Sequence, residues 1–166
     1  MKVLFASTQD VKRYSALQGS IDADKFITHI EIAQKKHVEP VLGTDLFERI
    51  ETEVNAGSIS TDIDNLIKEY IKPITINYTL VEYLRIAPYE FTNKGIMKPT
   101  SENSSQAGTE EVESLIQHYR NTAETYVERF QNFMVYNQDK FPEWNTNNED
   151  DLYPNYQEPF HGWQLD

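Results

Sequence analysis

Hydrophobic side chains recur at helical spacing over most of the chain, and the clearest run begins at Thr109. Glu110, Glu111 and Glu113 follow it and complement the positive end of a helix dipole. The apolar positions then repeat at i, i+3, i+4 and i+7, and they are Val112, Leu115, Ile116, Tyr119, Ala123, Tyr126, Val127, Phe130 and Met134. About 26 residues at a rise of 1.5 Å predict a helix of roughly 40 Å.

Three more helical stretches are predicted before this one. The first covers residues 22–39, and Pro40 and Gly43 are expected to interrupt it, the proline because it cannot donate a backbone hydrogen bond. The second covers 44–55 and begins at a threonine, a favoured N-cap residue. The third covers 60–87 and contains Pro73, which should kink or split it.

The remaining segments are expected to be short or extended. Residues 3–5 are apolar and precede a helical turn that Ser7 or Thr8 can cap. Asn-Lys-Gly marks the turn of a small hairpin over 91–97. The predicted fold is therefore mainly α, a small helical bundle with one short β-hairpin and extended N- and C-terminal arms. Its parts are an N-terminal arm over 1–20, a body over 21–136 and a C-terminal arm over 137–166.

The C-terminal arm, 137–166, shows no helical or strand period and contains both tryptophans. Ordering about thirty residues costs roughly 1–2 kcal/mol each, whereas burying one aromatic side chain returns only roughly 1.5–3 kcal/mol. If ordered, this arm is expected to lie against neighbouring chains. Its aromatic residues are predicted interface anchors, namely Phe141, Trp144, Tyr153, Tyr156, Phe160 and Trp163.

Composition narrows the class of function. The net charge is −12 and the chain has no cysteine, so disulfides and thiolate metal sites are excluded. Sequence-specific nucleic-acid binding is disfavoured because such affinity rests largely on Lys and Arg contacts to phosphate. Acidic walls around a channel would instead let DNA slide through. No apolar run approaches about 18 residues, so no membrane span is predicted.

The sequence predicts no catalytic site, cofactor or metal. The four histidines lack the Glu-x-x-His and His-Glu-x-x-His spacings of metal-binding helices, and they are His29, His37, His118 and His161. The acidic triplet Glu149–Asp151 lacks the alternating ligands and glycine of a calcium loop. No phosphate loop or nucleophile elbow is present.

Six segments resemble the small neck proteins of tailed bacteriophages, especially the crAss-like type. They are Phe5–Tyr14, His37–Phe47, Ile71–Tyr78, Phe91–Ile96, Tyr119–Tyr126 and Phe141–Asn145. The resemblance implies a non-enzymatic virion structural protein in the head-to-tail connector, made in the host bacterial cytoplasm. Such proteins form rings, commonly twelvefold, below the portal. They extend the DNA channel and carry the tail.

The expected partners are further copies of the chain, the portal protein, other neck or tail proteins, and DNA that passes without sequence-specific binding. The hairpin is a second candidate contact, into the lumen or onto the next ring, through Asn93, Lys94, Gly95 and Ile96. The alternative is a soluble helical adaptor that binds one protein partner through its acidic tail and forms no cyclic oligomer. A metal-dependent hydrolase is disfavoured because the chain lacks a ligand set.

Overall fold

The computed structural model describes residues 3–15, 24–93, 95–97, 108–145 and 153–154. The predicted mainly helical class is confirmed. The α-helices are α1 Thr8–Arg13, α2 Asp24–Ala33, α3 Glu39–Leu42, α4 Thr44–Ala56, α5 Thr61–Leu66, α6 Lys72–Ile86 and α7 Thr109–Tyr136. Two π-helical segments, Gln34–Val38 and Ile67–Ile71, join α2 to α3 and α5 to α6.

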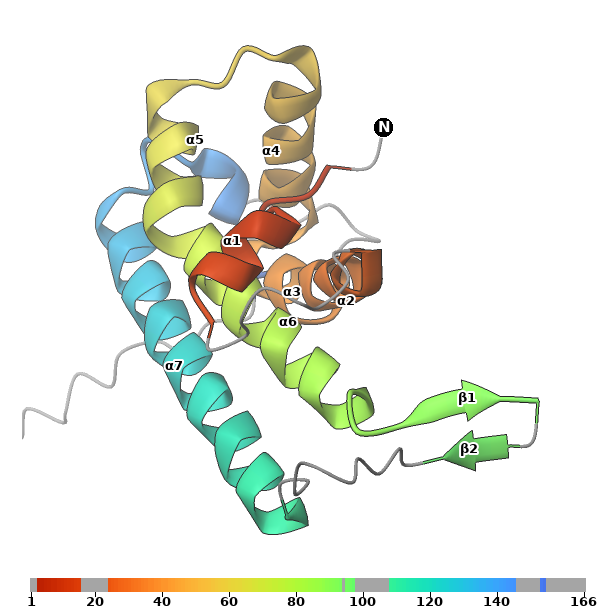
Figure 1. Ribbon diagram of the computed structural model, residues 1–166. Coiled ribbons are helices and arrows are strands. Elements are labelled where there is room, and N and C mark those ends of the chain that lie inside the picture. Colours follow the sequence, from red (N-terminus) through yellow and green to blue (C-terminus); the bar gives the residue numbers. More distant parts are fainter. Residues whose placement is uncertain (1–2, 16–23, 94, 98–107, 146–152, 155–166) are drawn as a thin grey trace, which may run out of the picture.

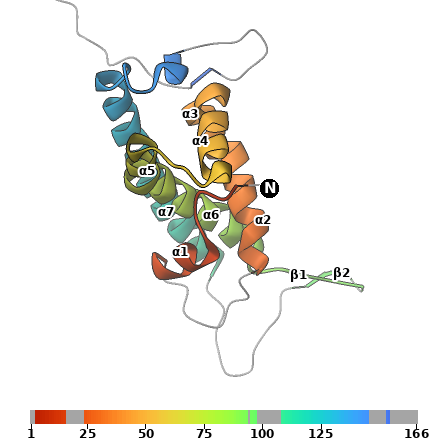
Figure 2. The same ribbon diagram turned by 90° about the horizontal axis from the view of Figure 1, so that it is seen from above.

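Short elements complete the described chain. Strands β1 (Glu90–Thr92) and β2 (Gly95–Met97) pair antiparallel, with Phe91 opposite Ile96. A 3₁₀ turn, Pro142–Asn145, follows α7. Helices α6 and α7 lie side by side, and α4 and α5 stand at the end of the bundle opposite the hairpin (Figure 1). Figure 2 shows the hairpin extending away from the helices.

The predicted last helix is confirmed and slightly longer than expected. It covers 28 residues from Thr109 to Tyr136. The carboxylate of Glu111 accepts the backbone N–H of Gly108 at 2.9 Å, which satisfies one of the donors left free at a helix start. The predicted cap of the first turn is also present, because the Ser7 hydroxyl accepts the backbone N–H of Asp10 at 3.1 Å.

Of the two predicted interruptions, Gly43 does end the helix, whereas Pro40 does not interrupt it. Pro40 lies in the first turn of α3, directly after a π-helical segment, and Pro73 lies likewise in the first turn of α6. A proline removes one N–H and crowds the carbonyl four residues back. The wider π turn, in which the N–H of Lys72 bonds to the carbonyl of Ile67, accommodates that loss. The chain therefore stays helical through both prolines.

The predicted N-terminal arm is part of the body over residues 3–15. Val3, Phe5 and Val11 are at most 5% exposed. The buried amide of Gln34 donates to the Val3 carbonyl at 3.0 Å and accepts the Phe5 N–H at 2.9 Å. The Phe5 ring meets Phe47 edge-on with centroids 5.1 Å apart. Two hydrogen bonds between the Gln34 side chain and the backbone, together with core packing, hold this segment in place.

The start of the predicted C-terminal arm also belongs to the body. Phe141 and Trp144 are each 1% exposed and lie in the main core. The Trp144 indole N–H donates to the Val41 carbonyl at 3.2 Å, and the Arg49 guanidinium pairs with the Glu143 carboxylate at 2.9 Å. These contacts lie within one chain, so the assignment of Phe141 and Trp144 as anchors for a neighbouring chain is wrong.

We expect Trp144→Ala to lower the free energy of unfolding by about 3–5 kcal/mol, because it empties a large core site and leaves the Val41 carbonyl unpaired. Urea unfolding measures this from the shift in midpoint. Tyr136→Ala is the matched control, since Tyr136 is 87% exposed and its loss should change stability by less than about 0.5 kcal/mol. Equal effects of the two changes would contradict the assignment of Trp144 to the core.

Candidate interaction groove

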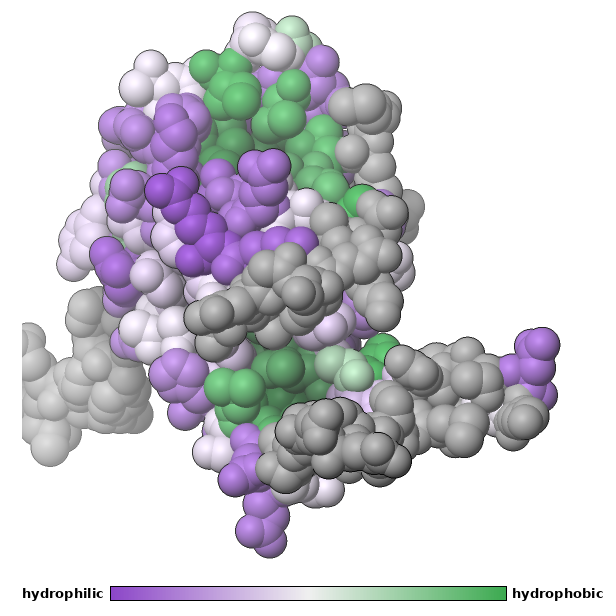
Figure 3. Space-filling model, in the orientation of Figure 1, coloured by the Kyte–Doolittle hydropathy of each residue, from purple (hydrophilic) through white to green (hydrophobic). Residues whose placement is uncertain are grey.

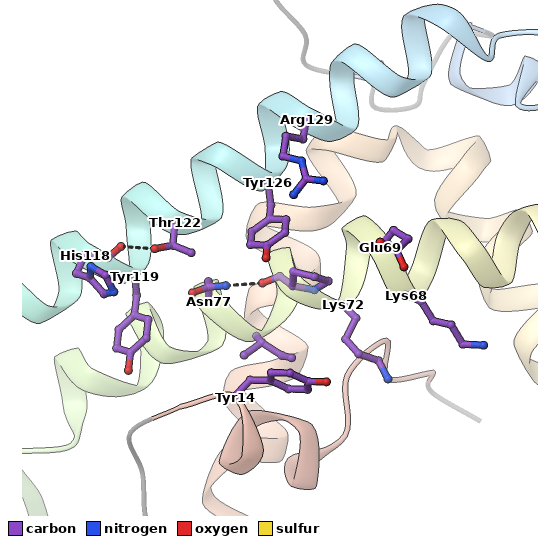
Figure 4. A pocket seen from close by; sticks show the side chains of 12 residues that line it. Tyr14, Lys68, Glu69, Lys72, Asn77, His118, Tyr119, Thr122, Tyr126 and Arg129 are labelled. Carbon is purple, nitrogen blue, oxygen red and sulfur yellow. Dashed lines mark hydrogen bonds between the residues drawn. The ribbon is translucent and has the colours of Figure 1, made fainter.

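A groove of about 470 Å³ lies between α7 and the helix formed by the second π-helical segment and α6. Tyr14, at the end of α1, approaches from the third side (Figure 4). This volume falls within the roughly 300–1,000 Å³ typical of ligand sites. The groove is the candidate functional site of the protein.

Helical spacing brings two rows of side chains to this groove. His118, Thr122 and Tyr126 lie four residues apart on α7, and Lys68 and Lys72 lie four apart on the facing helix. Residues separated by four lie above one another on one helix face. Figure 4 shows the tyrosine rings extending from α7 into the space between the helices. Packing of α6 on α7 therefore creates the groove from two stripes.

The lining of the groove contains more basic than acidic side chains, although the chain carries −12. Glu69 is the single carboxylate among its described lining residues, against Lys68, Lys72 and Arg129. Lys68 pairs with Asp64, and Lys72 lies 3.3 Å from Asp10. The Arg129 guanidinium lies 5.6 Å from the centre of the Tyr126 ring. In the described part of the chain no carboxylate pairs with this guanidinium, so it can bind an anion.

Three tyrosines supply the aromatic surface of the groove. Tyr14 is 66% exposed, and Tyr119 and Tyr126 are half-buried. Their ring faces can pack on other rings and their hydroxyls can donate hydrogen bonds. Among the described residues no group of histidines and carboxylates could hold a metal ion. The arrangement suits binding of a ligand that combines rings with negative charge.

A second cluster surrounds His37, where the first π-helical segment meets α6. His37 Nε2 lies 2.8 Å from the Glu82 carboxylate, and its ring stacks on Tyr78 with centroids 4.0 Å apart. Burial lowers the pKa of His37 below its usual value, and Glu82 offsets only part of this effect. Burial also raises the pKa of Glu82, but hydrogen bonds from His37 and Lys36 outweigh it and leave that pKa lowered. Neutral His37 thus donates to ionised Glu82, a contact that joins two helices.

None of the predicted site residues that the structure describes lines this groove. Tyr153 is 44% exposed. Asn93 and Gly95 are exposed at the hairpin turn, and Ile96 lies in β2. The other predicted residues fall outside the described part of the chain, and they are Lys94, Tyr156, Phe160 and Trp163.

Sequence reasoning missed the groove because it assigned Tyr119 and Tyr126 to the apolar stripe of the last helix. The structure shows that both side chains pack against the core and also line the groove. A usable signal is present at Lys68 and Lys72, two cations four residues apart before a proline. Their relation to the tyrosines of α7 depends on packing between helices distant in sequence.

Acid should destabilise the protein through His37. In the unfolded chain this imidazole titrates at its usual value near 6.5, above its pKa in the folded protein, so the unfolded state binds more protons between the two values. Stability is full above about pH 6.5 and falls as the pH drops below it. His37→Gln keeps a donor for Glu82 and should lose less stability between pH 7.5 and pH 5. Thermal unfolding over this range measures the difference, and identical losses would exclude His37 as the group responsible.

Comparison with known proteins places the chain in a family. No curated protein and no solved structure matches it. In the described ranges no helix is both long enough and apolar enough to cross a membrane. Residues 38–157, most of the chain, match a family of unknown function, DUF6712. The match covers α3 to α7, including the groove-lining side of both α6 and α7. The protein therefore belongs to the DUF6712 family.

Proposed function

We propose that this protein is a virion structural protein that forms a ring in the head-to-tail connector of a tailed bacteriophage. The ring lies below the portal, extends the DNA channel and links capsid to tail. The resemblance to crAss-like neck proteins supports this assignment. One observation in the structure carries it, namely the exposed apolar surface around the projecting hairpin at one end of the bundle.

That end consists of the last turn of α6, the first turns of α7 and the hairpin (Figure 1). Ile86 is 45% exposed, Tyr89 48% and Leu115 40%. Figure 3 shows hydrophobic surface beside the base of the hairpin. A two-stranded hairpin is only marginally stable alone in water, and clustered exposed apolar side chains mark interaction sites. Both features support contact with another protein chain at this end.

The segments that resemble neck proteins have scaffold roles. His37–Phe47 contains α3, the turn at Gly43 and the start of α4. Gly43 adopts φ +76°, which residues with a side chain rarely adopt. Ile71–Tyr78 contains the helical turn around Pro73. A resemblance carried by scaffold elements fits a structural protein better than an enzyme.

The hairpin turn, Asn93–Ile96, belongs to this proposal as a contact into the lumen or onto the next ring. The acidic balance of the chain suits a channel through which DNA passes without adhering. The partners are copies of the chain, the portal and other neck or tail proteins. The protein is located in the virion and is made in the host cytoplasm.

The test is the mass of the purified full chain, alone and mixed with portal-containing particles, by native mass spectrometry. We expect recruitment in a cyclic multiple, commonly twelvefold. Tyr89→Asp should reduce recruitment at least about tenfold, because it places a charge in an apolar contact. Tyr136→Asp, at an exposed site on the opposite end of α7, should leave recruitment unchanged.

A free monomer indifferent to portals would overturn the proposal and favour the adaptor. Surface substitutions test the contact more directly than a chain shortened before Phe141, because that truncation also removes two core side chains. Loss of recruitment after such a truncation would follow from unfolding alone.

A further inference from the structure

We infer that the groove between α6 and α7 receives residues 155–166 of a neighbouring copy of this chain. This inference rests on the proposed ring and names the contact that joins adjacent subunits. Its basis is the match between a tyrosine-lined groove that contains the Arg129 guanidinium and an acidic, aromatic segment of the same chain. The occupant is therefore a peptide segment and the recognising surface is built from three helices.

The two surfaces are complementary in charge. Residues 155–166 contain the acids Glu158 and Asp166 and no Lys or Arg. In the groove, Lys68 and Lys72 pair with Asp64 and Asp10, so the complementarity rests mainly on Arg129. The planar guanidinium of Arg129 can form two parallel hydrogen bonds with one carboxylate. Among the described residues this guanidinium has only the Tyr126 ring as a partner, so it can accept an acidic ligand without breaking an ion pair.

The two surfaces also match in shape and polarity. The segment carries three rings, Tyr156, Phe160 and Trp163. The tyrosines of the groove offer ring faces and hydroxyls, and aromatic pairs prefer offset or edge-to-face contact over 4.5–7 Å, worth about 0.5–1.5 kcal/mol beyond burial. Aromatic anchors supply affinity while charged groups fix register. The same segment therefore supplies both kinds of contact.

The described residues closest to this segment in sequence pack on the body of their own chain, and twelve residues follow them. Phe141 and Trp144 lie in the core, and Pro154 is buried. Twelve extended residues reach about 40 Å at roughly 3.3–3.6 Å each. That reach equals the length of α7, about 42 Å for its 28 residues. An extended segment of this length can therefore span a distance comparable to the length of α7.

A contact of this type generates a ring. Groove and tail are different surfaces, so each copy binds one neighbour and is bound by another. Such heterologous contacts close into rings when the rotation between copies completes a circle. The negative charge that repels copies in general is thereby offset locally by the Arg129 guanidinium of each copy.

The absence of cysteine allows a direct test by cross-linking of full-length chains. One chain carries Thr122→Cys in the groove and a second carries Gln157→Cys in the tail. Each has a single thiol, so only contact between two copies joins the groove to the tail. After mixing with portal-containing particles and a mild disulfide oxidant, we expect a covalent heterodimer. Glu128→Cys, an exposed α7 position outside the groove, replaces Thr122→Cys as control and should give at least about fivefold less heterodimer.

Charge reversal tests the chemistry of the contact. Adding Arg129→Glu to the groove chain should slow heterodimer formation about five- to tenfold, because it removes a favourable charge and adds a repulsive one. Lys140→Glu also reverses a charge, at an exposed position outside both the groove and the hairpin end, and should leave the rate unchanged. Equal rates for the two reversals would overturn the assignment of the groove.

The masses of the same samples separate the two hypotheses. Cyclic multiples without the heterodimer would overturn this inference and leave the ring intact. The heterodimer without cyclic multiples would support tail binding and overturn the ring. A chain carrying both Thr122→Cys and Gln157→Cys that closes only on itself would show that the tail occupies its own groove, which also overturns the inference.

Discussion

The burial of α6 is the constraint on which the rest of the structure depends. Helices α1, α2 and α7 all pack against it, so two polar residues in its middle, Thr75 and Thr79, are fully buried. Their hydroxyls donate to the carbonyls of Ile71 and Thr75 at 2.7 Å. A buried hydroxyl without a partner would cost about 1–3 kcal/mol. Satisfied within their own helix, these small side chains allow close packing, and the position of α6 then fixes both the groove and the hairpin.

The two π-helical segments contain residues that hold the fold together or line the groove. Each π-helical segment precedes a proline and contains a residue with a particular role. Gln34 begins the first segment and holds the N-terminal chain through two backbone hydrogen bonds. Lys68 lies in the second and lines the groove. Insertions of this type recur at functional positions in helices. Here the loss of a proline hydrogen bond is coupled to the placement of side chains that a regular helix would direct elsewhere.

The sequence was sufficient to predict the mainly helical class and the position of α7, because both depend on periodicity within one segment. It was not sufficient to predict where the body of the protein begins and ends. Gln34 contacts Val3 across 31 residues and Trp144 contacts Val41 across 103, and no local pattern records either contact. The entropy argument for the C-terminal arm failed at Phe141 and Trp144 because it treated six aromatics as equivalent. The groove was missed because its two rows of lining residues meet only after α6 packs on α7, and no local pattern records that packing.

In the proposed ring, a groove with low intrinsic affinity for a free peptide can still select the tail of a neighbouring copy. Exposed ion pairs contribute only about 0–1 kcal/mol each, so Lys68 and Arg129 alone would hold a free peptide poorly. A neighbouring subunit already held at the hairpin end makes tail binding nearly intramolecular, and the effective concentration then replaces intrinsic affinity. The negative charge of the whole chain opposes binding of other acidic proteins at long range. Selectivity therefore comes from the arrangement of copies, and the groove needs only enough attraction to fix the register of the tail.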